Sequence, residues 1–375
     1  MMGARLHVCF VLPSLNGGGA ERAAVKIMNA LDSTRFARSM YVFRREGRYV
    51  DDVSPEVTLV AASHDTRWSR IAQLAGYLRS ERPDVVVCFL SYFSAFVAAL
   101  LSGRFPRVVV NQQTPMSAFL RDRDYHWHRP VQRRVFERVV RAIYPRMAAV
   151  VATSPGVAAD LTSAFHLPAE RVVIIPNPVD LPEIDTLSRE PLAAVATDGR
   201  PVIVAAVRLA EAKNYPLLVE SLRLLRRERP FTALILGEGE LERSIRDAIA
   251  GAGLENDVRL CGFQTNPWKY MARADVFALT SRYEGFGNVL VEAMACGAPV
   301  VATSSPGTRE IVEPGSTGLL VDDHAPEPFA RALADVLSDP PRRASMSRAA
   351  RAAAERFALP GVVQRYEALF EHLAA

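Results

Sequence analysis

Two carboxylates lie on either side of a glycine-broken segment in "EGFGNVLVE", which runs from Glu284 to Glu292. Gly285 and Gly287 lack a Cβ atom, so the backbone there can approach a ligand closely. A helix predicted over 288–296 would present free amides at its start, and such amides bind anions, while carboxylates accept hydrogen bonds from sugar hydroxyls. The segment therefore predicts a ligand in which a phosphate is flanked by neutral hydroxyls. The amides expected to face the phosphate are those of Phe286, Gly287 and Asn288.

Two cations bracket a second loop, in "VRLAEAKN", which follows the apolar run "PVIVAAV". Charge-assisted contacts from Arg208 and Lys213 to a diphosphate would stabilise the negative charge that builds on a departing nucleotide. Combined with the two glutamates, these cations predict a site for a nucleotide diphosphate attached to a sugar.

A glycine run, Gly17 to Gly19, follows the first apolar run of the chain in "SLNGGGAER". Bare backbone can approach an anion closely, so Gly17, Gly18 and Gly19 could lie against an anionic group of a ligand. The same run could instead form only a tight turn between a strand and a helix.

Polar residues near the end of another predicted strand, in "NQQTP", could contact an acceptor molecule. His126 and His128, in "YHWHRP", are expected to be surface or packing residues rather than a metal pair, and no metal site is predicted. The candidate acceptor-side residues are Asn111, Gln112, Gln113 and His126.

The elements that must position these residues alternate along the chain. Apolar, β-branched runs of strand length are separated by segments with helical spacing, which indicates an α/β fold with parallel, doubly wound sheets. The alternation lapses in a proline-rich stretch and then restarts, so two such domains are expected. The predicted boundaries are 1–178 for the first domain, 179–199 for a linker, 200–357 for the second domain, and 358–375 for a C-terminal helix packed back on the first domain.

Four stretches together resemble the GT-B glycosyltransferases of family 4: "GGGAER", "VRLAEAKN", "GEGEL" and the two glutamates separated by seven residues. The resemblance covers nearly the whole chain and is most specific from about 200 to 325. It implies two Rossmann-like domains that face a central cleft, an acceptor-side domain first and a nucleotide-sugar donor domain second.

The resemblance also implies residue roles. The first glutamate of the family motif contacts the donor sugar and the second binds the ribose hydroxyls, while the cation pair grips the diphosphate without a metal or cofactor. The implied catalytic residues are Glu284, Arg208 and Lys213. The donor-binding residues expected with them are Glu292, Gly285, Phe286, Gly287, Asn288, Gly18, Gly19 and Phe263.

The family resemblance implies a retaining reaction, in which the acceptor attacks from the face that the diphosphate leaves. The leaving phosphate can then take the acceptor's proton, and no Ser-His-Asp or Cys-His arrangement stands out in the chain. One departure is Val207, at a position where the family commonly has glycine.

The composition is that of an ordinary globular protein, with 375 residues, 49% hydrophobic and 23% charged. The four cysteines have no CxxC spacing, so reduced thiols are expected rather than a zinc site or disulfides. No apolar stretch reaches the roughly 20 residues that span a bilayer. A cytoplasmic protein is expected.

The net charge of +4 is unevenly distributed, because arginines crowd the stretch 121–146 between apolar residues. This pattern indicates a basic amphipathic helix, which is either a solvated helix or a surface that meets anionic lipid headgroups or a phosphorylated acceptor. A peripheral position at the inner face of the plasma membrane is therefore a hypothesis. Nucleic acid is not an expected partner, since no recognisable binding module accompanies the charge.

The function expected from these features is hexosyl transfer to a glycan or lipid-linked acceptor in bacterial lipopolysaccharide or capsule assembly, from a UDP-sugar rather than a GDP-sugar. One alternative is a dinucleotide-dependent oxidoreductase, suggested by the glycine run but lacking G-x-G-x-x-G phasing. Another is a non-catalytic scaffold at a membrane surface, which would leave the donor-binding residues unexplained.

Overall fold

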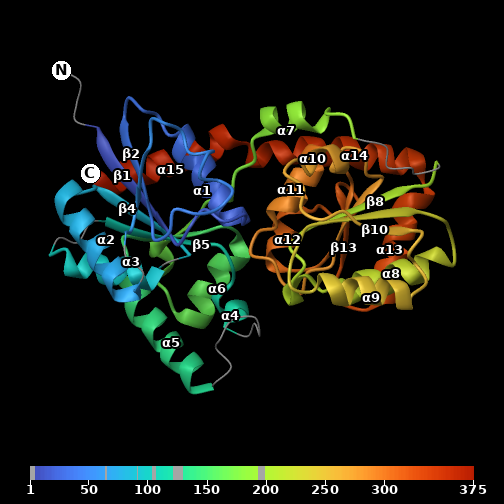
Figure 1. The fold of residues 1–375 in the computed structure, drawn as a ribbon, viewed down its shortest axis with the longest axis horizontal. Helices are drawn as coiled ribbons and strands as arrows, with labels where there is room; N and C mark the ends of the chain where they lie inside the picture. Colours follow the sequence, from blue (N-terminus) through green and yellow to red (C-terminus); the bar gives the residue numbers. More distant parts are fainter. Residues whose placement is uncertain (1–4, 64–65, 91, 104–106, 121–129, 193–198) are drawn as a thin grey trace. The chain divides into compact units, whose positions relative to one another are not determined.

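The computed structural model of the chain describes residues 5–63, 66–90, 92–103, 107–120, 130–192 and 199–375. The chain divides into two compact units, the first comprising Met1–Pro178 and Phe357–Ala375 and the second Val179–Arg356. Each unit holds one parallel sheet with helices on both faces (Figure 1). This arrangement confirms the predicted α/β class with two doubly wound domains.

The first unit is built on a seven-stranded sheet in the order β3-β2-β1-β4-β5-β6-β7. Its central strands are buried on both faces, as in the fully buried "VVVCF" of β4, and such β-branched runs are typical of covered parallel sheets. The chain order reverses between β1 and β4. The strands are β1 (Leu6–Leu12), β2 (Phe36–Val42), β3 (Thr58–Ala61), β4 (Val85–Phe89), β5 (Arg107–Gln112), β6 (Ala149–Ala152) and β7 (Val172–Ile174).

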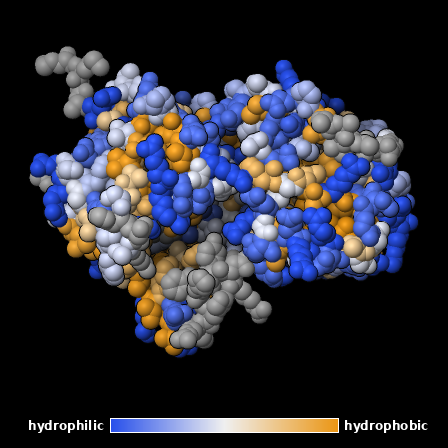
Figure 2. Space-filling model, viewed as in Figure 1, coloured by the Kyte–Doolittle hydropathy of each residue, from blue (hydrophilic) through white to orange (hydrophobic). Residues whose placement is uncertain are grey.

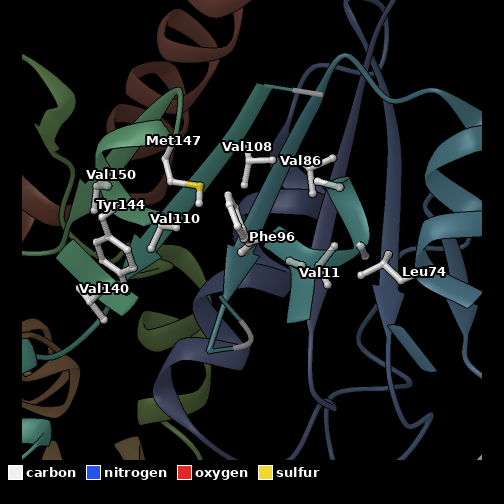
Figure 3. Close-up of a cluster of buried hydrophobic side chains, with 14 of the residues drawn as sticks. Val11, Leu74, Val86, Phe96, Val108, Val110, Val140, Tyr144, Met147 and Val150 are labelled. Atoms are coloured by element: carbon white, nitrogen blue, oxygen red, sulfur yellow. The ribbon is translucent and has the colours of Figure 1, made fainter. Parts of the chain in front are cut away.

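Two hydrophobic cores lie on opposite faces of this sheet. The buried side chains of α1 (Gly19–Ala30) and α15 (Leu359–Ala374) belong to one core. Figure 3 shows part of the other core, where Leu74, Phe96 and Tyr144 pack with valines of the strands. The helices of this second face are α2 (Arg67–Glu81), α3 (Tyr92–Leu101), α4 (Met116–Phe119), α5 (Pro130–Ile143) and α6 (Pro155–Phe165), with 3₁₀ turns η1 (Tyr144–Arg146) and η2 (Ala169–Arg171) between elements.

The second unit repeats the architecture with six parallel strands in the order β10-β9-β8-β11-β12-β13. Its strands are β8 (Val202–Ala206), β9 (Thr232–Leu236), β10 (Val258–Leu260), β11 (Val276–Leu279), β12 (Val300–Thr303) and β13 (Gly318–Val321). Its helices are α7 (Leu181–Ser188), α8 (Tyr215–Arg226), α9 (Glu242–Gly251), α10 (Trp268–Met271), α11 (Asn288–Ala295), α12 (Pro306–Ile311), α13 (Pro326–Ser338) and α14 (Pro340–Ala354), with η3 (Glu211–Lys213) and η4 (Glu355–Phe357).

The stretch 179–199, predicted to be a linker, instead contains helix α7 of the second unit. Asp180 caps this helix by accepting a hydrogen bond from the Glu183 amide, and Pro182 lies in its first turn. Proline is compatible with a helix start because the amide it lacks has no partner there. Pro182 therefore marks the beginning of a helix, and the Leu181 side chain of that helix is buried.

Helix α15 closes one face of the first unit. Its Phe370 is fully buried and makes edge contacts with Phe10 and Phe36, at ring-centroid distances of 6.3 and 6.2 Å. The Asn111 amide donates a 2.5 Å hydrogen bond to the hydroxyl of Tyr366 on the same helix. The last residues of the chain therefore complete the core of the first unit.

Replacing Phe370 by alanine should lower the free energy of unfolding of the first unit by about 3–5 kcal/mol, because it empties a fully buried aromatic site. Urea denaturation followed by circular dichroism measures this change. The matched control is Gln364→Ala on the exposed side of α15, expected to stay within about 0.5 kcal/mol of wild type. Equal stability of the two variants would contradict the packing of α15.

Candidate functional site

The strand order of the second unit reverses between β8 and β11, which are neighbours in the sheet. In open α/β sheets, ligands bind outside the carboxyl ends of the strands at such a reversal. Arg208 and Lys213 follow β8, and Glu284 follows β11. The topology thus brings together three charged residues that the sequence analysis had assigned to one site.

Lys213 and Glu284 form an ion pair, with 2.7 Å between Nζ and Oε1. Their side chains are only 22% and 12% exposed. The Ser281 hydroxyl donates a second hydrogen bond to the same carboxylate at 2.7 Å. Because the pair is partly shielded from water, each charge stabilises the other, and an anionic ligand at Lys213 would compete with Glu284 for the ammonium group.

Backbone contacts hold the two loops together around this pair. The Thr280 hydroxyl donates to the carbonyl of Lys213 at 3.0 Å, and the Arg282 amide donates to the carbonyl of Ala212 at 2.8 Å. A third segment also contacts the Glu284 loop, because the Gly307 amide of α12 donates to the carbonyl of Glu284 at 3.2 Å. The position of the carboxylate is therefore fixed by three segments of the second unit.

Arg208 is much more accessible, with 72% of its side chain exposed. Its Nη2 lies 3.0 Å from Oε2 of Glu240, which the sequence analysis had noted only as part of "GEGEL". The backbone amide of Glu240 and the Arg208 guanidinium hold the pKa of the Glu240 carboxyl below its usual range, against a smaller opposing effect of desolvation. Exposed ion pairs are weak, so the guanidinium can exchange Glu240 for a phosphate at little cost.

Val207, where the family commonly has glycine, lies in a closely packed part of this loop. Its carbonyl accepts a 2.9 Å hydrogen bond from the Tyr215 hydroxyl. A Cβ atom on Gly237 would clash with the same carbonyl, and one on Gly239 would clash with the carbonyl of Leu209. Gly237 and Gly239 therefore allow the loop after β9 to pack closely against the backbone around Arg208, although Val207 replaces the glycine that is common in the family.

Glu292 lies inside α11 and is almost completely buried, at 5% exposure. Its Oε2 accepts a 3.1 Å hydrogen bond from Nε1 of Trp268, which is itself buried. Burial, followed by the negative charge of Glu292, raises the pKa of the Cys296 thiol to about 12. A carboxylate held in this way is not a solvated charge at a helix end, and Trp268 is a partner that the sequence analysis did not identify.

The segment between the glutamates leads directly into the start of helix α11. Gly287 is the N-cap of α11 and has φ +98°, a left-handed conformation that favours glycine. Phe286 is buried at 2% exposure, while Gly285 packs against Gly307, where an added Cβ atom would lie 2.7 Å from the Gly285 carbonyl carbon. The sequence-predicted helix over 288–296 corresponds to α11, which starts at Asn288.

The glycine run lies at the corresponding edge of the first unit, where the order reverses between β1 and β4. Gly18 is the N-cap of α1 and Gly19 is its first residue. The Glu21 carboxylate lies so close to Gly18 that a Cβ atom there would clash with it. The start of α1 therefore already has a carboxyl group beside it. Burial raises the pKa of this carboxyl group.

The polar residues proposed for an acceptor are mostly committed to the fold of the first unit. Asn111 is fully buried against Tyr366, and Gln112, 3% exposed, accepts a 2.9 Å hydrogen bond from the Tyr144 hydroxyl. Both side chains thus already have partners within the first unit, and their contact with an acceptor stays a prediction. Gln113 is half-buried and exchanges hydrogen bonds with Asn177.

Two further predicted residues are His126 and Phe263. His126 lies outside the described residues. Phe263, which follows β10, is 37% exposed. Among the residues that the structure describes, no cluster of three His, Cys, Asp or Glu side chains could hold a metal ion.

Comparison with known proteins identifies the family of this chain. Residues 191–353 match the family model described as glycosyl transferases group 1, and residues 17–183 match the model of glycosyltransferase family 4. The 4-alpha-N-acetylgalactosaminyltransferase of Campylobacter jejuni that acts on N-acetylgalactosamine-N,N'-diacetylbacillosaminyl-diphospho-undecaprenol is 30% identical over 69% of this chain and 68% of its own. The chain belongs to the group 1 glycosyltransferases.

Other similar proteins agree with this family. The lipopolysaccharide core biosynthesis glycosyltransferase LpsE of Rhizobium meliloti is 34% identical over 37% of this chain, and the match spans 40% of LpsE. Anabaena HepE, solved in complex with UDP-glucose, superposes with a TM-score of 0.81 over 99% of this chain and 100% of its own, at 22% identity. That structural likeness shows a shared fold, and it confirms the GT-B architecture expected from the sequence.

Replacing Gly287 by alanine should destabilise the second unit by about 1–3 kcal/mol, because alanine is strained at φ +98°. Thermal or urea unfolding measures the loss. The control is Gly251→Ala at the end of α9, where an added Cβ atom meets nothing within 4 Å and φ is not positive. That control should be neutral or slightly stabilising, and a similar loss in both variants would argue against strain at the start of α11.

Proposed function

We propose that this chain is a retaining, metal-independent hexosyltransferase that uses a nucleotide-diphospho-sugar, with UDP preferred over GDP as the nucleotide. The acceptor is a glycan or a lipid-linked sugar in the assembly of a bacterial surface polysaccharide. The observation that carries the proposal is the partly buried Lys213–Glu284 pair at the strand reversal of the second unit, 2.7 Å apart and beside the exposed Arg208.

The donor is expected to bind by replacing existing contacts of these side chains. The diphosphate would take the Lys213 ammonium from Glu284 and the Arg208 guanidinium from Glu240, gaining charge-assisted hydrogen bonds to both. The Glu284 carboxylate would then accept hydrogen bonds from hydroxyls of the donor sugar. Glu292, already oriented by Trp268, would accept hydrogen bonds from the ribose.

The proposed transfer step is a retaining one. The acceptor hydroxyl attacks the anomeric carbon on the side from which the diphosphate departs, and the bond between that carbon and the phosphate oxygen breaks. The proton of the hydroxyl passes to the departing phosphate, so no protein base is required. Lys213 and Arg208 stabilise the charge that accumulates on the leaving group, which is where preorganised cations contribute most to rate.

The acceptor class is supported by the relatives. The Campylobacter relative is named for a diphospho-undecaprenol-linked acceptor, and the Rhizobium relative for lipopolysaccharide core synthesis. A lipid-linked acceptor would place the enzyme at the inner face of the plasma membrane. No helix among the described residues is long and apolar enough to cross a bilayer.

The alternatives fit the chain less well. Membership of a glycosyltransferase family decides against a dinucleotide-dependent oxidoreductase. A non-catalytic scaffold would have no use for a shielded lysine–glutamate pair that is held by three segments of the second unit.

Release of nucleotide from UDP-sugars and GDP-sugars, assayed with EDTA present, tests the proposed reaction. We expect slow release by the wild-type protein that EDTA does not abolish, and a loss of about ten- to a hundredfold in Glu284→Gln, since a charged hydrogen bond to the sugar is worth about 1.5–3 kcal/mol. Affinity for free nucleotide should change little in this variant. The matched control is Glu255→Gln, an exposed glutamate of the same unit.

Two results of this assay would contradict the proposal. Turnover that disappears with EDTA and returns with a divalent cation would exclude the metal-independent mechanism. Equal losses of turnover and of nucleotide affinity in Glu284→Gln would mean that this carboxylate organises the loop instead of contacting the sugar.

The second glutamate should affect binding. Glu292→Gln keeps an oxygen that can accept from Trp268 but loses the carboxylate charge, so calorimetry should show free UDP or GDP bound about tenfold more weakly, which corresponds to about 1.4 kcal/mol. Thermal unfolding of the same variant checks that the core around Trp268 is intact. Unchanged affinity in a stable variant would remove Glu292 from the nucleotide site.

A further inference from the structure

A hollow of about 790 Å³ lies at the amino edge of the sheet in the first unit. Its wall includes Phe36 and Thr58, which are the first residues of β2 and β3, and Glu81, which is the last residue of α2. Sites for small molecules have volumes of roughly 300–1,000 Å³. The hollow is therefore large enough to hold a ligand of its own.

The position of the hollow separates it from the opposite edge of the same sheet. Strand β1 has seven residues, and the glycine run follows its carboxyl end. His7, which lines the hollow, lies at the amino end of this strand. Because a strand rises about 3.3 Å per residue, the two ends of β1 are roughly 20 Å apart. A ligand in the hollow would therefore not contact the glycine run.

Two polar side chains in the wall of the hollow are buried. Hydrophilic residues cover much of the surface that Figure 2 shows, but Ser39 is only 1% exposed and the Arg38 side chain only 4%. Burial of a polar group is unfavourable unless its hydrogen bonds are made. The contacts of Ser39 and Arg38 therefore show which groups the fold holds in place around the hollow.

Ser39 joins an imidazole to a phenol. Its hydroxyl lies 2.9 Å from Nε2 of His7, whose Nδ1 lies 3.3 Å from the carbonyl oxygen of Glu81. Because a carbonyl only accepts hydrogen bonds, Nδ1 carries the proton in the neutral ring and Nε2 accepts from Ser39. The Tyr77 hydroxyl is also hydrogen-bonded to Ser39, and burial raises the pKa of this phenol, which therefore stays protonated. Ser39 thus fixes the position of Tyr77.

Arg38 fixes the position of a carboxylate. Its Nη1 donates to the carbonyls of Asn29 and Leu31 at 2.9 and 3.2 Å, and its Nη2 donates to Glu56 at 2.5 Å. The Glu56 side chain is 70% exposed. Since a carboxylate offers about four acceptor positions, the bond to Arg38 leaves others for a ligand.

The charges around the hollow are balanced. It is lined by two arginines, Arg5 and Arg38, and by two glutamates, Glu56 and Glu81. An anionic ligand would meet both carboxylates and a cationic ligand would meet both guanidinium groups, whereas a neutral polar ligand meets neither repulsion. Sugar hydroxyls suit such a wall, because each can donate to a carboxylate and accept from a guanidinium or hydroxyl group.

We propose that this hollow binds a neutral oligosaccharide. The carboxylates of Glu56 and Glu81 accept hydrogen bonds from its hydroxyls, the Arg5 guanidinium and the Thr58 hydroxyl donate to its oxygens, and the ring of Tyr77 packs against an apolar face of a sugar. The buried contacts described above hold Glu56 and Tyr77 before the ligand arrives. Such preorganisation lowers the entropic cost of binding.

The oligosaccharide site has a consequence for the reaction, and this step alone rests on the proposed function. An enzyme that extends a glycan would have a second contact with the glycan, away from the edge at which the sugar is transferred. Two weak contacts with one polymer reinforce each other, because the first raises the effective concentration for the second. The enzyme would then stay on its glycan while it exchanges donors.

Saturation-transfer NMR of the full-length protein with disaccharides, without donor, tests the site. The neutral probes are cellobiose, lactose and N,N′-diacetylchitobiose, and we expect at least one of them to bind at millimolar concentration. The charged analogues of cellobiose are chitobiose, which carries two amines, and cellobiouronic acid, which carries a carboxylate. Neither analogue should bind more tightly than cellobiose, and saturating UDP should not displace the bound saccharide.

Two variants place the saccharide in the hollow. Thr58→Trp puts a large ring into it and should weaken binding at least about tenfold. Glu81→Gln leaves an excess of positive charge, so cellobiouronic acid should gain up to about fivefold relative to cellobiose. The matched controls are Ser163→Trp, exposed on α6, and Glu255→Gln, exposed in the second unit, and neither should change binding.

Circular dichroism and thermal unfolding show whether each variant is folded. Glu81 is exposed, so Glu81→Gln provides an independent test should Thr58→Trp not fold. A wild-type protein that binds none of the three neutral disaccharides would overturn the proposal. Tighter binding of a charged analogue than of cellobiose would also overturn it and assign the hollow to an ion.

The remaining outcomes separate this site from the proposed reaction. Saccharide binding that UDP displaces, or that both variants leave unchanged, would place the saccharide elsewhere and overturn the proposal, even if the protein still releases nucleotide from sugar donors. Saccharide binding that behaves as expected, without any donor turnover, would leave the oligosaccharide site standing and reject the proposed reaction.

Discussion

The ion pair between Lys213 and Glu284 joins two loops that are 71 residues apart in the chain. It can form because β8 and β11 are neighbours in the sheet, although β9 and β10 lie between them in sequence. The parallel direction of both strands places the loops that follow them at one edge. The sheet topology therefore brings the two loops together, and the ion pair joins them. In the proposed function an anionic ligand would replace the carboxylate at the lysine.

The remaining site residues depend on the same arrangement. Glu292 lies on α11, whose N-cap Gly287 comes shortly after Glu284, so fixing the loop also fixes the helix start. Arg208 differs because its side chain, among the described residues, forms an ion pair only with Glu240, and that contact is exposed. The candidate site thus combines buried or shielded groups with one exposed cation, Arg208, which is accessible to an anionic ligand.

Much of the fold and many of the candidate site residues could be predicted from sequence, and the features that were missed have physical causes. The alternation of strands and helices, the start of α11 and the charged loops follow from local patterns. The direct contacts do not follow from local patterns, because they join segments that are distant in sequence. These contacts are Lys213 with Glu284, Arg208 with Glu240 and Trp268 with Glu292. The same holds for the hydrogen bonds of Asn111 with Tyr366 and of Gln112 with Tyr144, which also join distant segments. Helix α7 was missed because Pro182 was interpreted as part of a linker, whereas it lies in a capped first turn.

The central claim is that the shielded pair opens to receive a nucleotide-diphospho-sugar. A crystal structure of the protein with an intact UDP-sugar tests it most directly. The account predicts that diphosphate oxygens lie within hydrogen-bond distance of Lys213 Nζ and the Arg208 guanidinium, with sugar hydroxyls on Glu284 and ribose hydroxyls on Glu292. A nucleotide bound elsewhere, with Nζ of Lys213 still 2.7 Å from the Glu284 carboxylate, would contradict it.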